Sequence, residues 1–297
     1  MIPRLLHTIL IQLACYFTAV LNVRAHREPI GETHPLVNVE DGHFVIYNVT
    51  PLKDGERWAR SRTIYTPEGK LLTPTERITD PKWKRIIWPT EQPTADIIEL
   101  LPPKGESATK GEEQQLWLRS NSNGRPVSNR LNPSGMSSTS GFKSIITPKN
   151  LGLTYAAIPL ADDKEFVNCK PLAFSLISRP EFTTTKTIRL GQCALIYDPV
   201  TSNIVEAGNR FWFAWVRPAE NFAKLADNKK WQTVLGNYNL ATGAFEQFVL
   251  NEPSNWNTSL HLNTCNGWLC VAWHCWKDGV YPGQSIIVTH FQKLPDR

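Results

Sequence analysis

The segment 266–276 reads Asn-Gly-Trp-Leu-Cys-Val-Ala-Trp-His-Cys-Trp, a turn that runs directly into a short, dense apolar strand. Similar apolar alternation occurs 58 residues earlier, and again 58 residues before that. The three matched sets are Leu269, Val271 and Trp273; Phe211, Phe213 and Trp215; and Leu153, Tyr155 and Ala157. Two equal steps indicate an internal repeat.

Two further patterns extend the repeat. The Asp41-Gly42 pair precedes an apolar strand much as Asn266-Gly267 does, and residues 95–99 occupy the place of a weaker copy. A second landmark, a glycine turn between two strands, recurs at Gly69, Gly124 and Gly243, which are 55 and then 119 residues apart.

A repeat of this length with several short strands per unit is typical of a β-propeller, because a four-stranded sheet cannot cover both of its own faces. We therefore expect an all-β propeller of five blades, each of about 50–60 residues. The alternative is a β-sandwich in which the similarity between apolar strands arose by chance.

Residues 1–25 have the composition of an export signal. Arg4 gives a positive start, residues 5–21 are mostly apolar, and Val23-Arg24-Ala25 resembles a cleavage site. We expect cleavage after Ala25, leaving residues 26–297 as one propeller domain outside the cytoplasm, secreted or periplasmic. An uncleaved membrane anchor is the rival interpretation, since the apolar run is nearly long enough to span a bilayer. The rest of the chain has no apolar run of spanning length.

Charge and motifs narrow the function classes. Lysine and arginine (32) barely exceed aspartate and glutamate (27), and the two signs alternate along the chain, which argues against a nucleic-acid partner. No nucleophile elbow, zinc-protease motif or phosphate-binding glycine loop is present. We expect no cofactor.

Several acidic residues are candidates for glycoside hydrolysis, which needs two carboxylates across a sugar cleft. We single out Asp41, Asp96 and Glu99, with Glu40 beside Asp41. Each also has a structural explanation: Asp41 suits an Asp-Gly turn, and Asp96 suits the edge of a strand.

Tryptophan is concentrated near the C-terminus, where seven of the eleven lie between Trp212 and Trp276. Trp215 and Trp273 hold equivalent repeat positions, and we expect them in the core. Trp256, Trp268 and Trp276 flank the last repeated strand and are candidates for stacking on sugar rings.

Five cysteines follow the signal segment, so one has no intramolecular partner. Cys169 and Cys193 could bridge neighbouring strands, and Cys265 could pair with Cys275 or Cys270. Cys265, Cys270, His274 and Cys275 cluster in sequence, yet an extended strand scatters such side chains; we expect buried cysteines and disulfides here, with no metal.

The segments 41–47 and 266–273, strands that follow acidic or Asn-Gly turns, resemble the repeats of secreted bacterial sialidase-like propellers. The resemblance covers the repeat pattern, and the catalytic residues of that family do not match. It implies a propeller architecture and an extracytoplasmic setting, and it transfers no activity.

Three functional hypotheses follow. The leading one is an exported propeller that binds a ligand, a carbohydrate or a partner protein, without catalysis. The competing hypothesis is a propeller glycoside hydrolase whose carboxylates converge from different blades. The third is a structural component of the cell surface, with neither a pocket nor convergent acids.

Overall fold

The structure is a computed structural model of the whole chain. It describes the residue ranges 34–51, 57–79, 96–101, 115–120, 127–130, 136–146, 149–159, 169–178, 183–194, 204–218, 231–251, 257–276 and 285–295. The expected signal segment, residues 1–25, lies outside them, as does Trp256. In the part of the chain that is described, no helix has the length and hydropathy needed to cross a membrane.

The described strands form five antiparallel sheets, which we call blades I to V in chain order. Blade I contains β1 (His34–Glu40), β2 (His43–Pro51), β3 (Arg57–Tyr65) and β4 (Leu71–Arg77). Blade II contains β5 (Asp96–Leu101), β6 (Gln115–Ser120) and β7 (Val127–Arg130). Blade III contains β8 (Met136–Ile146), β9 (Asn150–Pro159), β10 (Cys169–Ser178) and β11 (Thr183–Ala194). Blade IV contains β12 (Val205–Ala207), β13 (Arg210–Pro218), β14 (Trp231–Asn239) and β15 (Phe245–Val249). Blade V contains β16 (Asn257–Cys265), β17 (Trp268–Trp276) and β18 (Ser285–Lys293).

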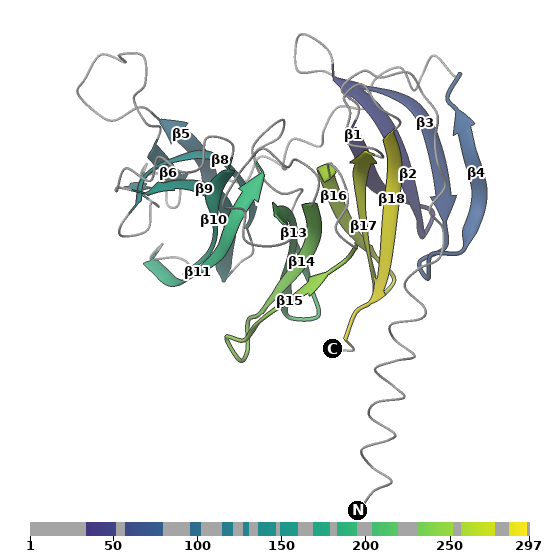
Figure 1. Cartoon of the computed structure of the whole chain (residues 1–297). Helices are drawn as coiled ribbons and strands as arrows, with labels where there is room; N and C mark the ends of the chain where they lie inside the picture. The colour runs from purple at the N-terminus through teal and green to yellow at the C-terminus, as the bar shows by residue number, and fades with distance from the viewer. Residues whose placement is uncertain are drawn as a thin grey trace, which may run out of the picture.

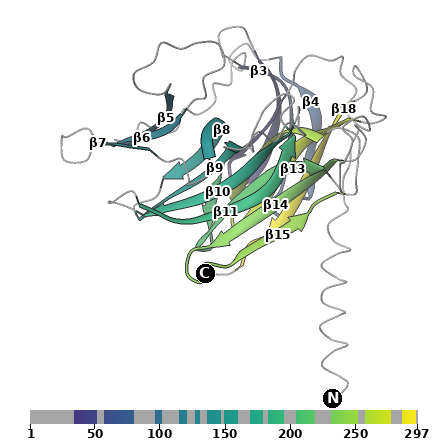
Figure 2. The same cartoon turned by 60° about the vertical axis from the view of Figure 1, so that its left-hand side comes forward.

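Within every blade the strands pair in chain order, as a meander. Blade II contacts blade III, blade III contacts blade IV, and blade IV contacts blade V. Blade V in turn contacts blade I, so the first and last described sheets lie side by side (Figures 1 and 2). The fold is a β-propeller. The expected all-β propeller is confirmed, in place of a sandwich of two sheets.

The core consists of apolar layers between neighbouring blades. Phe174 of blade III stacks on Phe213 of blade IV with ring centroids 4.8 Å apart. Trp212 of blade IV shares a buried cluster with Leu269 of blade V. Phe44 of blade I shares another with Cys270 of blade V. Among blades III, IV, V and I, neighbouring sheets thus cover one another, which is the physical reason for the repeat.

The strand that opened the sequence analysis, β17, lies between two of these layers. Leu269, Val271 and Trp273 face blade IV, whereas Cys270 and Ala272 face blade I. Because successive side chains of a strand point to opposite faces, a strand covered on both sides must be apolar throughout. This explains its density of apolar residues.

The 58-residue spacing marks the second strand of a blade. Leu153, Phe211 and Leu269 lie on β9, β13 and β17, which are second strands of blades III, IV and V, and all three are buried. Gly69 and Gly243 lie in turns between third and fourth strands, β3–β4 and β14–β15. Both landmarks of the repeat are confirmed at these positions, whereas Gly124 lies outside the described residues.

Side chains of blade V bind the backbone of blade I. The backbone N–H of Val37 on β1 donates to Nδ1 of His261 at 3.1 Å, and Nδ2 of Asn263 donates to the carbonyl of Val37 at 3.1 Å. Nδ2 of Asn266 reaches the carbonyl of Gly42 at 3.4 Å. An unpaired strand edge exposes such backbone groups, so β16 satisfies the edge of β1 without pairing as a strand.

Candidate functional site

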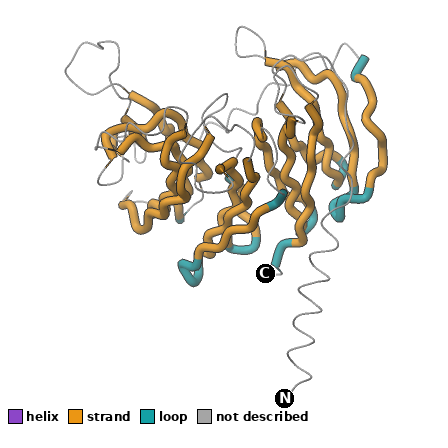
Figure 3. Tube along the Cα trace, viewed as in Figure 1, coloured by secondary structure: helices purple, strands orange, loops and turns teal. Residues whose placement is uncertain are grey.

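The two ends of the blades differ in the length of their connections. First and second strands are joined by two residues in β1–β2, β12–β13 and β16–β17, and by three in β8–β9. Second and third strands are joined by five residues in β2–β3, nine in β9–β10, twelve in β13–β14 and eight in β17–β18. We call these the hairpin end and the loop end. Figure 3 shows most of the described turns at the hairpin end, below the sheets.

Tight turns at the hairpin end explain several of the glycines and asparagines. Positive φ angles occur at both central residues of the pairs Asp41-Gly42, Gly208-Asn209 and Asn266-Gly267. Two-residue hairpins with positive φ at both positions match the twist of the flanking strands and favour Asn, Asp and Gly. Asp41 is exposed, at φ 49°, and its place in the turn accounts for its identity.

The candidate carboxylates do not form one described site. Asp41 follows the last residue of β1, at the hairpin end of blade I. Asp96 is the first residue of β5, where it pairs with Ser120, and Glu99 lies farther along the same strand, opposite Trp117. By the repeat spacing, β5 corresponds to the second strands β9, β13 and β17, whose first residues lie at the hairpin end. Their catalytic roles stay predictions.

The candidate tryptophans are divided between the two ends. Trp268 begins β17 at the hairpin end, is half-buried, and packs against the cluster of Phe44 and Cys270. Trp276 ends β17 at the loop end, opposite Ser285. Trp256 precedes the first residue of β16, Asn257, which pairs with Cys275. The described strand therefore places Trp276 at the loop end, opposite to Trp268, whereas Trp256 lies outside the described residues.

The proposed disulfides need correction. Cys265 is opposite Trp268 and Cys275 is opposite Asn257, so the two cysteines lie at opposite ends of the β16–β17 hairpin. A bond requires Cα atoms within about 7 Å, so a Cys265–Cys275 bond is wrong on geometric grounds.

The other two candidate pairs are Cys265 with Cys270 and Cys169 with Cys193. Cys265 and Cys270 share one buried cluster but form no disulfide, and burial raises the pKa of both thiols. Cys169 and Cys193 do lie on neighbouring strands, β10 and β11, but Cys169 is opposite Ala194 and Cys193 is opposite Lys170. Their bond stays a prediction.

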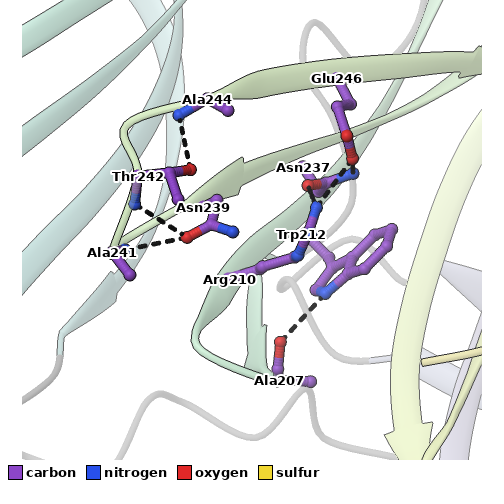
Figure 4. Close-up of polar contacts among 9 residues, drawn as sticks. All are labelled: Ala207, Arg210, Trp212, Asn237, Asn239, Ala241, Thr242, Ala244 and Glu246. Atoms are coloured by element: carbon purple, nitrogen blue, oxygen red, sulfur yellow. Dashed lines mark hydrogen bonds and ion pairs between the residues drawn. The ribbon is translucent and has the colours of Figure 1, made fainter. Parts of the chain in front are cut away.

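A polar network crosses blade IV near the hairpin end (Figure 4). The Arg210 guanidinium donates to Oδ1 of Asn237 at 2.6 Å and to Oε2 of Glu246 at 2.7 Å. Nδ2 of Asn237 donates to the same Glu246 oxygen at 3.2 Å. Asn237 is fully buried, so this network satisfies an amide that would otherwise be costly. An asparagine inside an apolar strand is the sequence signal that could have predicted this network, but we did not use it.

Blade I carries a similar arrangement. The hydroxyl of Tyr47, a buried residue, donates to Oε1 of Glu40 at 2.7 Å. Burial, together with the bond to Glu40, raises the pKa of the Tyr47 phenol, so the proton stays on the phenol. Glu40 is thereby held as an acceptor for a core residue. This structural role competes with a catalytic one.

One small cavity lies between blades I and V. It is lined by Ile46, Asn48, Ser61, Thr63, Tyr65, Thr75, Ile287 and Thr289, and has a volume of about 20 Å³. Its lining is rich in hydroxyls and carries no acid. Within the described residues, no three His, Cys, Asp or Glu side chains cluster as metal ligands.

Comparisons with known proteins show which solved structures this chain is similar to. A scan against protein-family models finds no match, and a search of curated proteins finds none either. Solved structures with similar folds include the GH43_1 enzyme from Xanthomonas citri complexed with xylotriose, with 12% identity, a TM-score of 0.37, and coverage of 96% of this chain and 93% of that chain. The catalytic domain of Coprinopsis cinerea GH62 α-L-arabinofuranosidase shows 9% identity, a TM-score of 0.37, and coverage of 91% and 94%.

A third similar structure is an exo-1,5-α-L-arabinanase from a bovine ruminal metagenomic library, with 8% identity, a TM-score of 0.38, and coverage of 90% and 94%. By their names, these neighbours are a GH43_1 enzyme, a GH62 arabinofuranosidase and an arabinanase. At such identities and TM-scores the likeness assigns no residue and no activity to this chain. A relationship to sialidase-like repeats stays a prediction.

Proposed function

We propose that the chain is a carbohydrate-binding β-propeller whose ligand site lies at the loop end. The observation that carries this proposal is the asymmetry of the connections: five to twelve residues join the second and third strands of blades I, III, IV and V, against two to five residues in the turns at the hairpin end. Long connections on a rigid scaffold are where binding residues concentrate.

The residue at that end with suitable chemistry is Trp276, with Trp256 nearby in sequence. An indole face stacks on the apolar face of a sugar ring. Trp268 has the same side chain at the opposite end of the same strand, which makes it a matched control.

The test is calorimetric titration of the purified chain with xylo- and arabino-oligosaccharides, starting from xylotriose. We expect Trp276→Ala to weaken binding about tenfold or more, since 1.4 kcal/mol corresponds to a factor of ten. Trp268→Ala, checked first for a native thermal transition, should bind as the wild type does. Equal losses in both variants, or no binding of any sugar in a wider glycan array, would contradict the proposal.

Glycan hydrolysis is the second candidate function, and it is the activity of the neighbours named above. Product analysis of the same titrations separates it from binding alone. If sugars are cleaved, Asp96→Asn and Glu99→Gln are the first substitutions to make, and Asp41→Asn is the third. Unchanged turnover in all three would exclude these acids as the catalytic pair.

We also propose that the protein is exported and that residues 1–25 are removed. Amino-terminal sequencing of the protein recovered from its source would show His26 as the first residue. Recovery of the intact amino terminus in the membrane fraction would favour the anchor instead.

A further inference from the structure

The joint between blades I and V has an apolar part and a polar part. In the apolar part, Phe291 of β18 packs its ring against Phe44 and Tyr65 of blade I, with centroids 5.7 and 5.1 Å apart. Farther along the same strands lies the 20 Å³ cavity, between β2, β3 and β4 on one side and β18 on the other.

Two oxygen atoms of this cavity are buried and unsatisfied. Within the described residues, Oδ1 of Asn48 and Oγ1 of Thr289 have no hydrogen-bond partner. Asn48 is only 4% exposed. They belong to different blades, Asn48 to β2 and Thr289 to β18. A buried polar atom without a partner costs about 1–3 kcal/mol, so a pair of them at one cavity calls for an occupant.

The cavity has the size and chemistry of a water site. A cavity needs about 10–15 Å³ to hold one water, and the water needs two to four polar partners. Besides the two unsatisfied oxygens, the lining offers the hydroxyls of Ser61, Thr63 and Thr75. Oγ1 of Thr63 already bonds Oγ1 of Thr75 at 2.8 Å, which leaves each hydroxyl capacity for a further contact.

We propose that an ordered water occupies this cavity and bridges Asn48 of blade I to Thr289 of blade V. The water donates to Oδ1 of Asn48 and exchanges a hydrogen bond with the Thr289 hydroxyl. It thereby completes the polar part of the joint between the first and last blades. Its role is separate from sugar binding at the loop end.

Substitution of Thr289 by valine tests the proposal, because the direction of the change in melting temperature differs between an occupied and a dry cavity. Valine has nearly the same shape but lacks the hydroxyl. If the water is present, Thr289→Val removes one of its partners and lowers the melting temperature by roughly 2–4 °C. If the cavity is dry, the substitution removes an unsatisfied hydroxyl, and the melting temperature stays unchanged or rises. That result would overturn the proposal.

Two controls make the test specific. Thr184→Val, at an exposed threonine of β11, should leave the melting temperature unchanged. Asn48→Ala combined with Thr289→Val should lose less than the sum of the single losses, because both side chains bind the same water. Strictly additive losses would overturn the bridge. A crystal structure that resolves ordered water would show a density peak between the two oxygens, and an empty cavity there would also overturn it.

Discussion

At the scale of single residues, the described polar side chains serve the joints and surfaces of blades. His261 and Asn263 hold the backbone of Val37, Glu40 accepts from Tyr47, and Arg210 satisfies Asn237. These are the residue types that sequence reading assigns to catalysis. Their geometry shows that burial of a polar group inside a propeller already demands partners of this kind.

Substitution of Arg210 tests this account on blade IV. Arg210→Met keeps much of the apolar stem but leaves Oδ1 of buried Asn237 without its donor, so we expect a loss of about 1–3 kcal/mol in the free energy of unfolding. Glu246→Gln is the matched control: its side chain is half exposed, and an amide oxygen can still accept from Arg210. Urea denaturation should therefore show a loss below about 1 kcal/mol for that variant. Equal losses would contradict the assignment.

A second residue-scale prediction concerns His290 on β18. Burial lowers the pKa of its imidazole below the ordinary value, partly offset by a hydrogen bond to Gln292. An unfolded histidine titrates near pH 6.5, so below that pH the unfolded chain binds a proton that the folded chain resists. The free energy of unfolding should therefore fall as the pH drops below about 6.5. In urea titrations at pH 7.5 and 5.5, His290→Gln should show a smaller fall than the wild type; an identical fall would be the contrary result.

At the scale of elements, the apolar strand around Trp273 could be predicted from sequence because residues 269–273 of β17 are buried between blades IV and I. The Asp-Gly and Asn-Gly turns were also readable, since positive φ restricts the residue types. The packing of Trp268 against blade I could not be predicted from the sequence. An exposed binding residue and one that packs on the next blade look alike in sequence, and only blade I decides between them.

The turn at Gly69 gives an element-scale prediction about the joint of blades I and V. Gly69 has φ +87°, and an added Cβ would lie 2.5 Å from the ring of Phe291. Gly267 has φ +77°, but an added Cβ would meet nothing within 4 Å. Gly267→Ala should cost only the backbone strain, about 1–2 kcal/mol.

Gly69→Ala should cost that strain plus displacement of the Phe291 ring, about a further 1–3 kcal/mol. Chemical denaturation of both variants measures the difference. Equal stability losses would mean that the turn of blade I does not rest on blade V.

At the scale of the whole molecule, the repeat predicted the propeller architecture, because Leu153, Phe211 and Leu269 mark the same strand in three successive blades. It could not predict how the first and last described blades join. His261 and Asn263 belong to no repeated motif, and they act on a residue more than 200 positions away. The expected Cys265–Cys275 disulfide was wrong because the two cysteines are near in sequence but lie at opposite ends of a hairpin.

Contact between the first and last described blades is the central claim, and residue-resolved hydrogen exchange at Val37 tests it most directly. Val37 donates its N–H to His261 of blade V, so protection of this amide depends on contact between the first and last blades. We predict that the Val37 amide exchanges as slowly as the core amides of β2, and that His261→Ala speeds its exchange while the core of β2 stays protected. Fast exchange at Val37 in the wild type, beside a protected β2, would contradict this contact between blades I and V.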